Sequence, residues 1–226
     1  MFIIGVPCHA PYLQFLDRCL TSIYKQTKAP DLIILSVSSC TDEVVPLVGS
    51  IPIKVLQTEQ HHTPGQNRNA IIEVASPNSI ISFIDADDML HPQHVDTVSK
   101  FFANHEEQDV LVMSFERNAN KQTFTVDDYK TFNWTDIPSE VQYFHNCYKP
   151  IYPPNWTPIM TWSPELEANG YVSANGPISF RRDRIDHIRY SPTITMGEDQ
   201  HFNAQLWEHG LKFSYTPSLY FIYFTN

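Results

Sequence analysis

Short apolar runs alternate with segments of helical periodicity through the first half of the chain. The runs are rich in β-branched and aliphatic residues, and they are continuous rather than alternating. Continuous apolar runs are typical of strands that are buried on both faces of a parallel sheet. The predicted strands cover residues 2–6, 32–37, 53–56, 80–84 and 110–113.

Helical spacing of apolar residues appears between these runs. One helix is expected after the first strand, one over residues 65–75, and one after Pro92, with this proline in its first turn. The strand–helix–strand alternation predicts an α/β fold with a doubly wound, mostly parallel central sheet. The apolar positions that carry the spacing in the first and third helices are Leu13, Leu16, Leu20 and Ile23, then Val95, Val98 and Phe101.

The pattern changes after Ser114. Residues 117–174 are rich in proline and aromatic residues and have no clear period, so loops and short elements packed on the sheet are expected there. Periodicity returns with a predicted strand at 177–180, a helix at 198–208 and a strand at 212–223. The economical interpretation is one domain over residues 1–226 with an irregular central excursion.

The overall charge argues against several classes of partner. The 226 residues include 15 Lys and Arg against 25 Asp and Glu, a formal net charge of −10. An acidic chain is a poor partner for nucleic acid or an anionic membrane. No window approaches the roughly 20 apolar residues that a membrane span needs, and the four cysteines form no Cys-x-x-Cys pair. A cytoplasmic protein without a membrane span is expected.

Three carboxylates follow the fourth predicted strand directly, in the run Asp85-Ala86-Asp87-Asp88. In open α/β sheets, ligands bind outside the carboxyl ends of the strands. Two carboxylates at such a turn suit a hard cation, Mg²⁺ or Mn²⁺, which takes oxygen ligands and substrate phosphates. The alternative is a helix N-terminus that carries acidic residues for electrostatic reasons.

Two further clusters could carry chemistry. Glu198 and Asp199 open a predicted helix after Gly197, where one carboxylate could act as a general base or both could serve only as helix capping. Arg68, after Gly65, could contact a phosphate or an acidic ligand. The adjacent His61 and His62 are not expected to face one site together. Neither Gly-x-Gly-x-x-Gly nor a Gly-Lys-Ser/Thr phosphate loop occurs, which excludes a Rossmann dehydrogenase and a P-loop NTPase.

The order of these motifs resembles glycosyltransferase family 2, the inverting group with the GT-A fold. The resemblance spans nearly the whole chain and is weakest across 115–170. It rests on Ile4-Gly5-Val6-Pro7, on Ser22-Ile23 with Gln26-Thr27, on Gly65 with Arg68-Asn69, on Asp85-Ala86-Asp87-Asp88, on Asn175-Gly176 through Arg182, and on Gly197-Glu198-Asp199. It implies a nucleotide-binding half over residues 1–114 and an acceptor-side half over 115–226.

The resemblance also implies roles for individual residues. Asp85 and Asp87 would bind a divalent cation, Mn²⁺ or Mg²⁺, and the ribose and diphosphate of a nucleotide-sugar donor. Asp199 would be the catalytic base for a glycan or other hydroxyl acceptor, with Glu198 in support. Arg68 would lie near the nucleotide, and the remaining donor pocket would be lined by Pro7, Cys8 and His9 at the end of the first strand.

The chain departs from the family pattern at two positions. Ser38 stands where the family usually has an acid that reads the nucleotide base, and Asn67 stands where alanine is usual. Either Ser38 substitutes as a donor-binding hydrogen-bond partner, Asp42 takes the place of the missing acid, or the nucleotide base is held differently. In the aromatic excursion, Trp156 and Trp162 are the candidates for stacking on an acceptor sugar.

Three functions remain open. The first is a metal-dependent inverting transferase that moves a single sugar, since the Gln-x-x-Arg-Trp element of processive synthases is absent. The second is a non-catalytic GT-A module that binds a nucleotide or glycan, and the loss of the acid at Ser38 supports it. A haloacid dehalogenase-type phosphotransferase ranks third, because Met89 stands where that family has Thr or Val.

Overall fold

One mixed sheet organises the described part of the chain. The structure is a computed structural model, and it describes residues 1–47, 49–118, 121–134, 137, 140–145 and 178–224. The order along the sheet is β3-β2-β1-β4-β8-β6-β9-β5, and β7 pairs with β9. The strands are β1 (Phe2–His9), β2 (Leu32–Ser38), β3 (Ile53–Gln57), β4 (Ile80–Phe83), β5 (Met89–Leu90), β6 (Val110–Asn118), β7 (Phe144–His145), β8 (Ile178–Arg181) and β9 (Phe213–Phe224).

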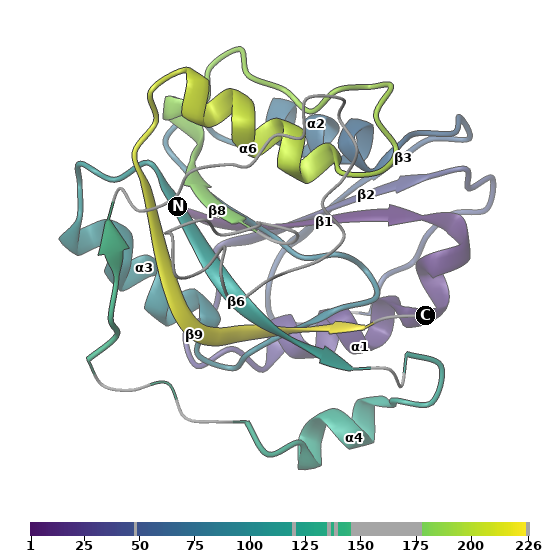
Figure 1. Ribbon diagram of the computed structural model, residues 1–226. Coiled ribbons are helices and arrows are strands. Elements are labelled where there is room, and N and C mark those ends of the chain that lie inside the picture. The colour runs from purple at the N-terminus through teal and green to yellow at the C-terminus, as the bar shows by residue number, and fades with distance from the viewer. Residues whose placement is uncertain (48, 119–120, 135–136, 138–139, 146–177, 225–226) are drawn as a thin grey trace.

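Helices cover both faces of this sheet (Figure 1). The α-helices are α1 (Leu13–Tyr24), α2 (Pro64–Val74), α3 (His94–Asn104), α4 (Val126–Thr131) and α6 (Glu198–Glu208), and two 3-10 turns lie at Ala10–Tyr12 and Arg182–Arg184. Strands β3, β2, β1 and β4 pair in parallel, and β8 runs antiparallel between β4 and β6. The predicted doubly wound, mostly parallel α/β sheet is confirmed.

Alternate residues of β1 enter two separate cores. Ile4 and Val6 pack with Leu16 and Leu20 of α1 on one face. On the other face Ile3 joins a cluster that holds residues of α2 and α6. A strand that feeds two cores needs apolar side chains at every position, which is why its sequence is a continuous apolar run.

Two local expectations change in the structure. Helix α3 begins at His94, so Pro92 precedes the helix instead of lying in its first turn; the carbonyl of Pro92 accepts a hydrogen bond from the amide of Thr27. The segment without periodicity after Ser114 begins with four more residues of β6 and contains the short helix α4. Most of the remainder, 146–177, lies outside the described residues.

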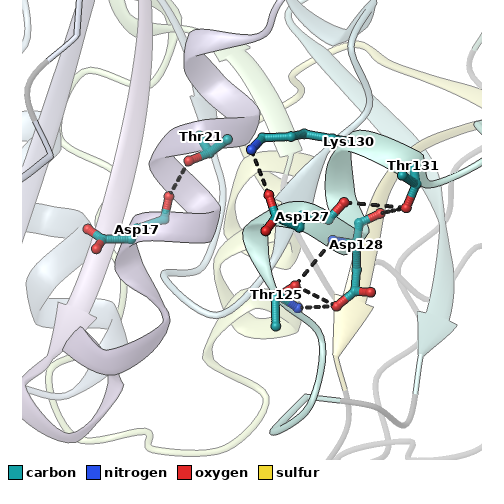
Figure 2. A network of polar contacts seen from close by, with 7 residues as sticks. All are labelled: Asp17, Thr21, Thr125, Asp127, Asp128, Lys130 and Thr131. Carbon is teal, nitrogen blue, oxygen red and sulfur yellow. Dashed lines mark hydrogen bonds and ion pairs between the residues drawn. The ribbon is translucent and has the colours of Figure 1, made fainter.

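Local capping explains why α4 forms in a sequence without helical periodicity. The hydroxyl of Thr125 accepts a hydrogen bond from the amide of Asp128, and the Asp128 carboxylate accepts one from the amide of Thr125 (Figure 2). This reciprocal capping box satisfies backbone donors that a six-residue helix would otherwise leave unpaired. Lys130 forms an ion pair with Asp127 on the exposed side of the same helix.

Within the described residues, no helix is both long enough and apolar enough to cross a membrane.

Gly5 marks the tightest contact between β1 and its neighbours. A Cβ at this position would lie 2.7 Å from Cε1 of Phe83 and 3.0 Å from Cγ2 of Ile71. We predict that Gly5→Ala lowers the free energy of unfolding by about 1–3 kcal/mol, because the Phe83 ring must move within a packed core. Urea unfolding measures the change, with the exposed Val45→Ala as the control. Equal stability of Gly5→Ala and the wild type would contradict this packing.

Candidate functional site

Parallel strands deliver the candidate site residues to one edge of the sheet. Strand β1 ends at His9, β2 ends at Ser38, and Asp85 follows β4 after one further residue. A cavity of about 370 Å³ lies at this edge, within the size range of small-molecule sites. The sequence-predicted residues that line it are Pro7, Cys8, His9, Arg68, Asp85, Asp87 and Glu198.

Arg68 is the centre of the charged wall of this cavity. Its Nη2 lies 2.6 Å from Oδ1 of Asp85, and its Nη1 lies 2.7 Å from Oε1 of Glu198. The side chain is almost fully buried. Burial acts to lower the pKa of Arg68, but the charges of Asp85, Glu198 and Asp199 outweigh it and hold the pKa above its usual value. Arg68 therefore stays charged and fixes both carboxylates.

The start of helix α2 explains how Arg68 reaches these carboxylates. The Thr63 hydroxyl accepts from the amide of Gln66, and the Gln66 side chain accepts from the amide of Thr63. This capping box begins α2 beside the cavity and places Arg68 in its second turn. Gly65 lies against Tyr190. A Cβ added to Gly65 would lie only 2.9 Å from Cβ of Tyr190, so a larger residue at position 65 would push α2 away from the site.

Asp87 has a cationic partner that the sequence did not indicate. Its Oδ2 lies 2.5 Å from Nζ of Lys121, a buried lysine that also lines the cavity. Burial and the neighbouring Asp85 raise the pKa of Asp87, whereas Lys121 opposes that shift. Lys121 lies in a segment without periodicity, and no motif surrounds it. Only the fold brings it to Asp87.

A second buried arginine holds the backbone on both sides of this ion pair. Nη2 of Arg18 donates to the carbonyl of Asp87 at 2.8 Å, and Nη1 donates to the carbonyl of Lys121 at 2.5 Å and of Phe124 at 3.1 Å. Its guanidinium carbon lies 4.2 Å from the ring centroid of Phe224. Arg18 thus joins α1, the turn after β4 and the segment that carries Lys121.

The third acid of the run, Asp88, has a different role from its neighbours. It is 1% exposed, and its Oδ1 accepts a hydrogen bond from the amide of Phe224 at 2.9 Å. Burial, followed by the charges of Asp85 and Asp87, raises the pKa of Asp88 well above its usual value. Asp88 therefore ties the turn to β9 and is not part of the cavity lining.

Imidazole side chains line the cavity next to β1. Nε2 of His9 lies 2.8 Å from the Ser39 hydroxyl and 3.1 Å from Nδ1 of His61. His62 also lines the cavity, so the expectation that His61 and His62 do not share one site is wrong. Burial, and then nearby Asp87, raises the pKa of the Cys8 thiol to about 12, so Cys8 contributes an uncharged thiol to this wall.

The two departures from the family pattern contact each other. Ser38 is fully buried, and its hydroxyl accepts a hydrogen bond from Nδ2 of Asn67 at 3.0 Å. Asn67 also donates to the carbonyl of Cys8 at 3.1 Å and accepts from the Ser36 hydroxyl at 3.1 Å. Ser38 lies behind the cavity and is not among its lining residues. Its role in donor binding stays a prediction.

Glu198 and Asp199 occupy the first turn of α6 but differ in position. Gly197 precedes them with a φ of 75°, a left-handed conformation that glycine adopts without strain. Glu198 lines the cavity and contacts Arg68. Asp199 is not among the lining residues, and its Oδ1 accepts a hydrogen bond from the amide of Gln200. Trp156 and Trp162 lie outside the described residues.

The carboxylates as they lie do not fit a divalent cation. Mg²⁺ usually takes one or two carboxylates together with substrate phosphates. Here Asp85 contacts Arg68 and Asp87 contacts Lys121, so a cation would compete with a protein cation at each. In the described part of the chain, no three His, Cys, Asp or Glu residues converge as a metal site.

A family model agrees with the fold. The model described as Glycosyl transferase family 2 matches residues 3–152, which is more than half of the chain. The chain belongs to glycosyl transferase family 2. No curated protein sequence was found to match it.

Solved structures similar to this family 2 chain include several of S. aureus TarS. TarS 1–349 in complex with UDP gives a TM-score of 0.64 at 18% identity, covering 100% of this chain and 60% of that one. TarS 1–349 in complex with UDP-GlcNAc gives 0.66 at 16% identity, with 100% and 58% covered. A longer TarS chain gives 0.63 at 18% identity, with 99% and 36% covered. This chain thus spans less than two thirds of these neighbours, and the likeness supports the GT-A fold.

The buried Asn67 network generates a stability prediction. Asn67→Ala removes three buried hydrogen bonds and leaves the carbonyl of Cys8 without this donor. We expect it to lower the free energy of unfolding by about 1–3 kcal/mol. Urea unfolding of Asn67→Ala, Ser38→Ala and the double variant measures the coupling. Strictly additive effects would contradict the Ser38–Asn67 contact, because residues that share a hydrogen bond are expected to be non-additive.

Proposed function

We propose that this chain transfers a single sugar from a nucleotide-sugar donor to a hydroxyl acceptor, with inversion at the anomeric carbon. The observation that carries the proposal is the charged wall of the cavity, where Arg68 holds Asp85 and Glu198 and where Asp87 lies beside Lys121. Family membership supports the reaction class. The TarS structures with UDP and UDP-GlcNAc make a uridine nucleotide the first donor to test.

The arrangement of the cavity walls supports a nucleotide-sugar as the ligand. The sheet order β3-β2-β1-β4 places the imidazoles of His61 and His9 toward one side of the cavity, and the charged groups that follow β4 toward the other. A nucleotide has the same polarity, with a largely uncharged base at one end and a diphosphate at the other. In the proposal, the base lies against the histidines and the diphosphate lies near Asp85, Asp87 and the neighbouring cations.

Asp199 is the proposed general base. Glu198 is held by the guanidinium of Arg68 at 2.7 Å, so its carboxylate already has a partner within the protein. Asp199 lies next to it in the first turn of α6. The acceptor hydroxyl gives its proton to Asp199, and its oxygen forms a bond to the anomeric carbon as the bond to the leaving phosphate oxygen breaks. The electron pair of that bond leaves with the nucleoside diphosphate.

The developing charge on the leaving diphosphate must be offset by positive groups. Arg68 and Lys121 are positive groups of this chain on the cavity wall. The family resemblance implies a dependence on Mn²⁺ or Mg²⁺, but the ion pairs on Asp85 and Asp87 do not fit such a cation, so no step of the proposed reaction passes through a metal ion. Sugar stacking by Trp156 and Trp162, the division into two halves at residue 114 and a cytoplasmic location stay predictions.

A non-catalytic GT-A module is the second candidate. The observation that favours it is the burial of Ser38, which removes a side chain at the family's usual base-reading position from the cavity. Such a module would bind a nucleotide or glycan in the same cavity without transferring sugar. Binding and transfer must therefore be measured separately.

Donor binding is the first test. A ligand that binds only the native state raises the unfolding midpoint by mass action. We expect one of UDP, GDP, CDP and dTDP, or one of their sugars, to raise the midpoint of thermal unfolding more than the others. Each ligand is measured with EDTA, Mg²⁺ and Mn²⁺. The absence of a shift with every nucleotide and every cation would contradict the proposed function.

The base assignment gives a second prediction. Asp199→Asn is expected to reduce sugar transfer at least about 100-fold, in line with the loss of a general base, while the thermal shift with nucleotide persists. Asp96→Asn on α3 is the control, because it removes a half-buried carboxylate that is not among the residues lining the cavity. Full transfer by Asp199→Asn would remove the base assignment, and transfer lost only in Glu198→Gln would move it to Glu198.

A further inference from the structure

Lys121 has an unusual environment for a lysine. It is 5% exposed, yet its ammonium lies on the cavity wall, 2.5 Å from Oδ2 of Asp87. The ammonium also lies 4.8 Å from the ring centroid of Tyr12, another lining residue. A buried ammonium loses its hydration, so it is retained only where anions and ring faces replace the water.

The backbone that carries Lys121 is also held by hydrogen bonds. Arg18 donates from one guanidinium nitrogen to the carbonyls of Lys121 and Phe124, and from the other to the carbonyl of Asp87. The same buried side chain thus sets the relative position of the two residues that form the ion pair. In the Lys121–Asp87 ion pair, the backbone carbonyls of both residues accept hydrogen bonds from Arg18. In this respect it differs from an exposed ion pair such as that of Lys130 with Asp127.

Positive charge is needed at this place in the proposed reaction. Asp85 and Asp87 put two carboxylates beside the proposed diphosphate position, and a diphosphate adds further negative charge. A cation on Asp87 offsets both the carboxylate and the phosphates, and Lys121 already supplies one. A fixed ammonium also needs no recruitment from solution, and a charge that is already in position stabilises developing negative charge without reorganisation.

We propose that Lys121 is a donor-binding residue that takes the place of the divalent cation on Asp87, so that a nucleoside diphosphate binds this chain without a metal ion. The ammonium keeps Asp87 charge-compensated when no donor is bound and contacts the phosphate oxygens when one is. This inference rests on the proposed function. It also makes Arg18 a positioning residue, since Arg18 holds Lys121 and Asp87 together through backbone contacts.

The test is isothermal titration calorimetry of the full chain in EDTA, and again with Mg²⁺ or Mn²⁺. The probes are UDP and inorganic pyrophosphate, because pyrophosphate presents the diphosphate group whatever base the donor carries. Lys121→Met removes the charge and keeps a stem of similar length. Lys121→Arg keeps the charge, and Lys130→Met on α4 is the matched control, because it removes an exposed lysine outside the cavity lining (Figure 2).

We expect the wild type and Lys130→Met to bind at least one of the probes equally well in EDTA and with added metal. Lys121→Met is expected to bind that probe about 10- to 100-fold more weakly in EDTA, the range for loss of a charged hydrogen bond. Added Mg²⁺ or Mn²⁺ is expected to restore its binding, because the cation can then occupy the vacated position on Asp87. Lys121→Arg is expected to retain metal-free binding.

Two results would overturn the inference while leaving the proposed function intact. One is wild-type binding only in the presence of metal. The other is a Lys121→Met variant that binds in EDTA within twofold of the wild type. Binding of neither probe under any condition would overturn the proposed function as well. Unfolding midpoints measured without ligand identify a variant that fails to fold, and the comparison of wild-type binding with and without metal decides the question in that case.

Discussion

The contact of Arg68 with both Asp85 and Glu198 is the interaction on which the candidate site depends. It joins three segments that are far apart in the chain, the second turn of α2, the turn after β4 and the first turn of α6. Arg68 and Glu198 are the buried members of this set, and removing one partner of a buried ion pair costs about 3–5 kcal/mol because the other charge is left unpaired. The fold therefore constrains Arg68 and its carboxylates together, and the cavity takes its shape from this constraint.

Arg18 plays a complementary part from the other face of the sheet. Arg68 contacts side chains, whereas Arg18 contacts backbone carbonyls and aromatic rings. A guanidinium suits both tasks because its donors lie in a rigid plane and its charge persists when it is buried. The turn that carries Asp85 and Asp87 is thus held from two sides. The two arginines and Asp88 therefore help to determine where the carboxylates of this turn lie.

Local sequence predicts much of the fold, but it predicts the candidate site only in part. The continuous apolar runs identify β1, β2 and β4 because those strands are buried on both faces, and the helix at 198–208 agrees with α6. Asp85 and Asp87 stand out because they directly follow a strand. Asp88 has the same residue type and the same neighbours, and only the contact with Phe224 shows that it is structural.

Other features depend on contacts between distant segments and have no local pattern. Lys121 lies in a segment without periodicity, more than 30 residues after Asp87. Ser38 and Asn67 appear in the sequence as two separate departures, and the fold shows them as partners in one hydrogen bond. The hydrogen-bond partner of a short polar side chain cannot be predicted from the sequence until the strand order and the helix positions are known.

A crystal structure of this chain with UDP, grown in the absence of divalent cations, tests the account most directly. The account predicts density for the diphosphate in the cavity, with phosphate oxygens within hydrogen-bonding distance of the Lys121 ammonium, and with the base against His9 and His61. Density for UDP at another place on the molecule, or a diphosphate in the cavity that leaves Lys121 on Asp87 alone, would contradict it.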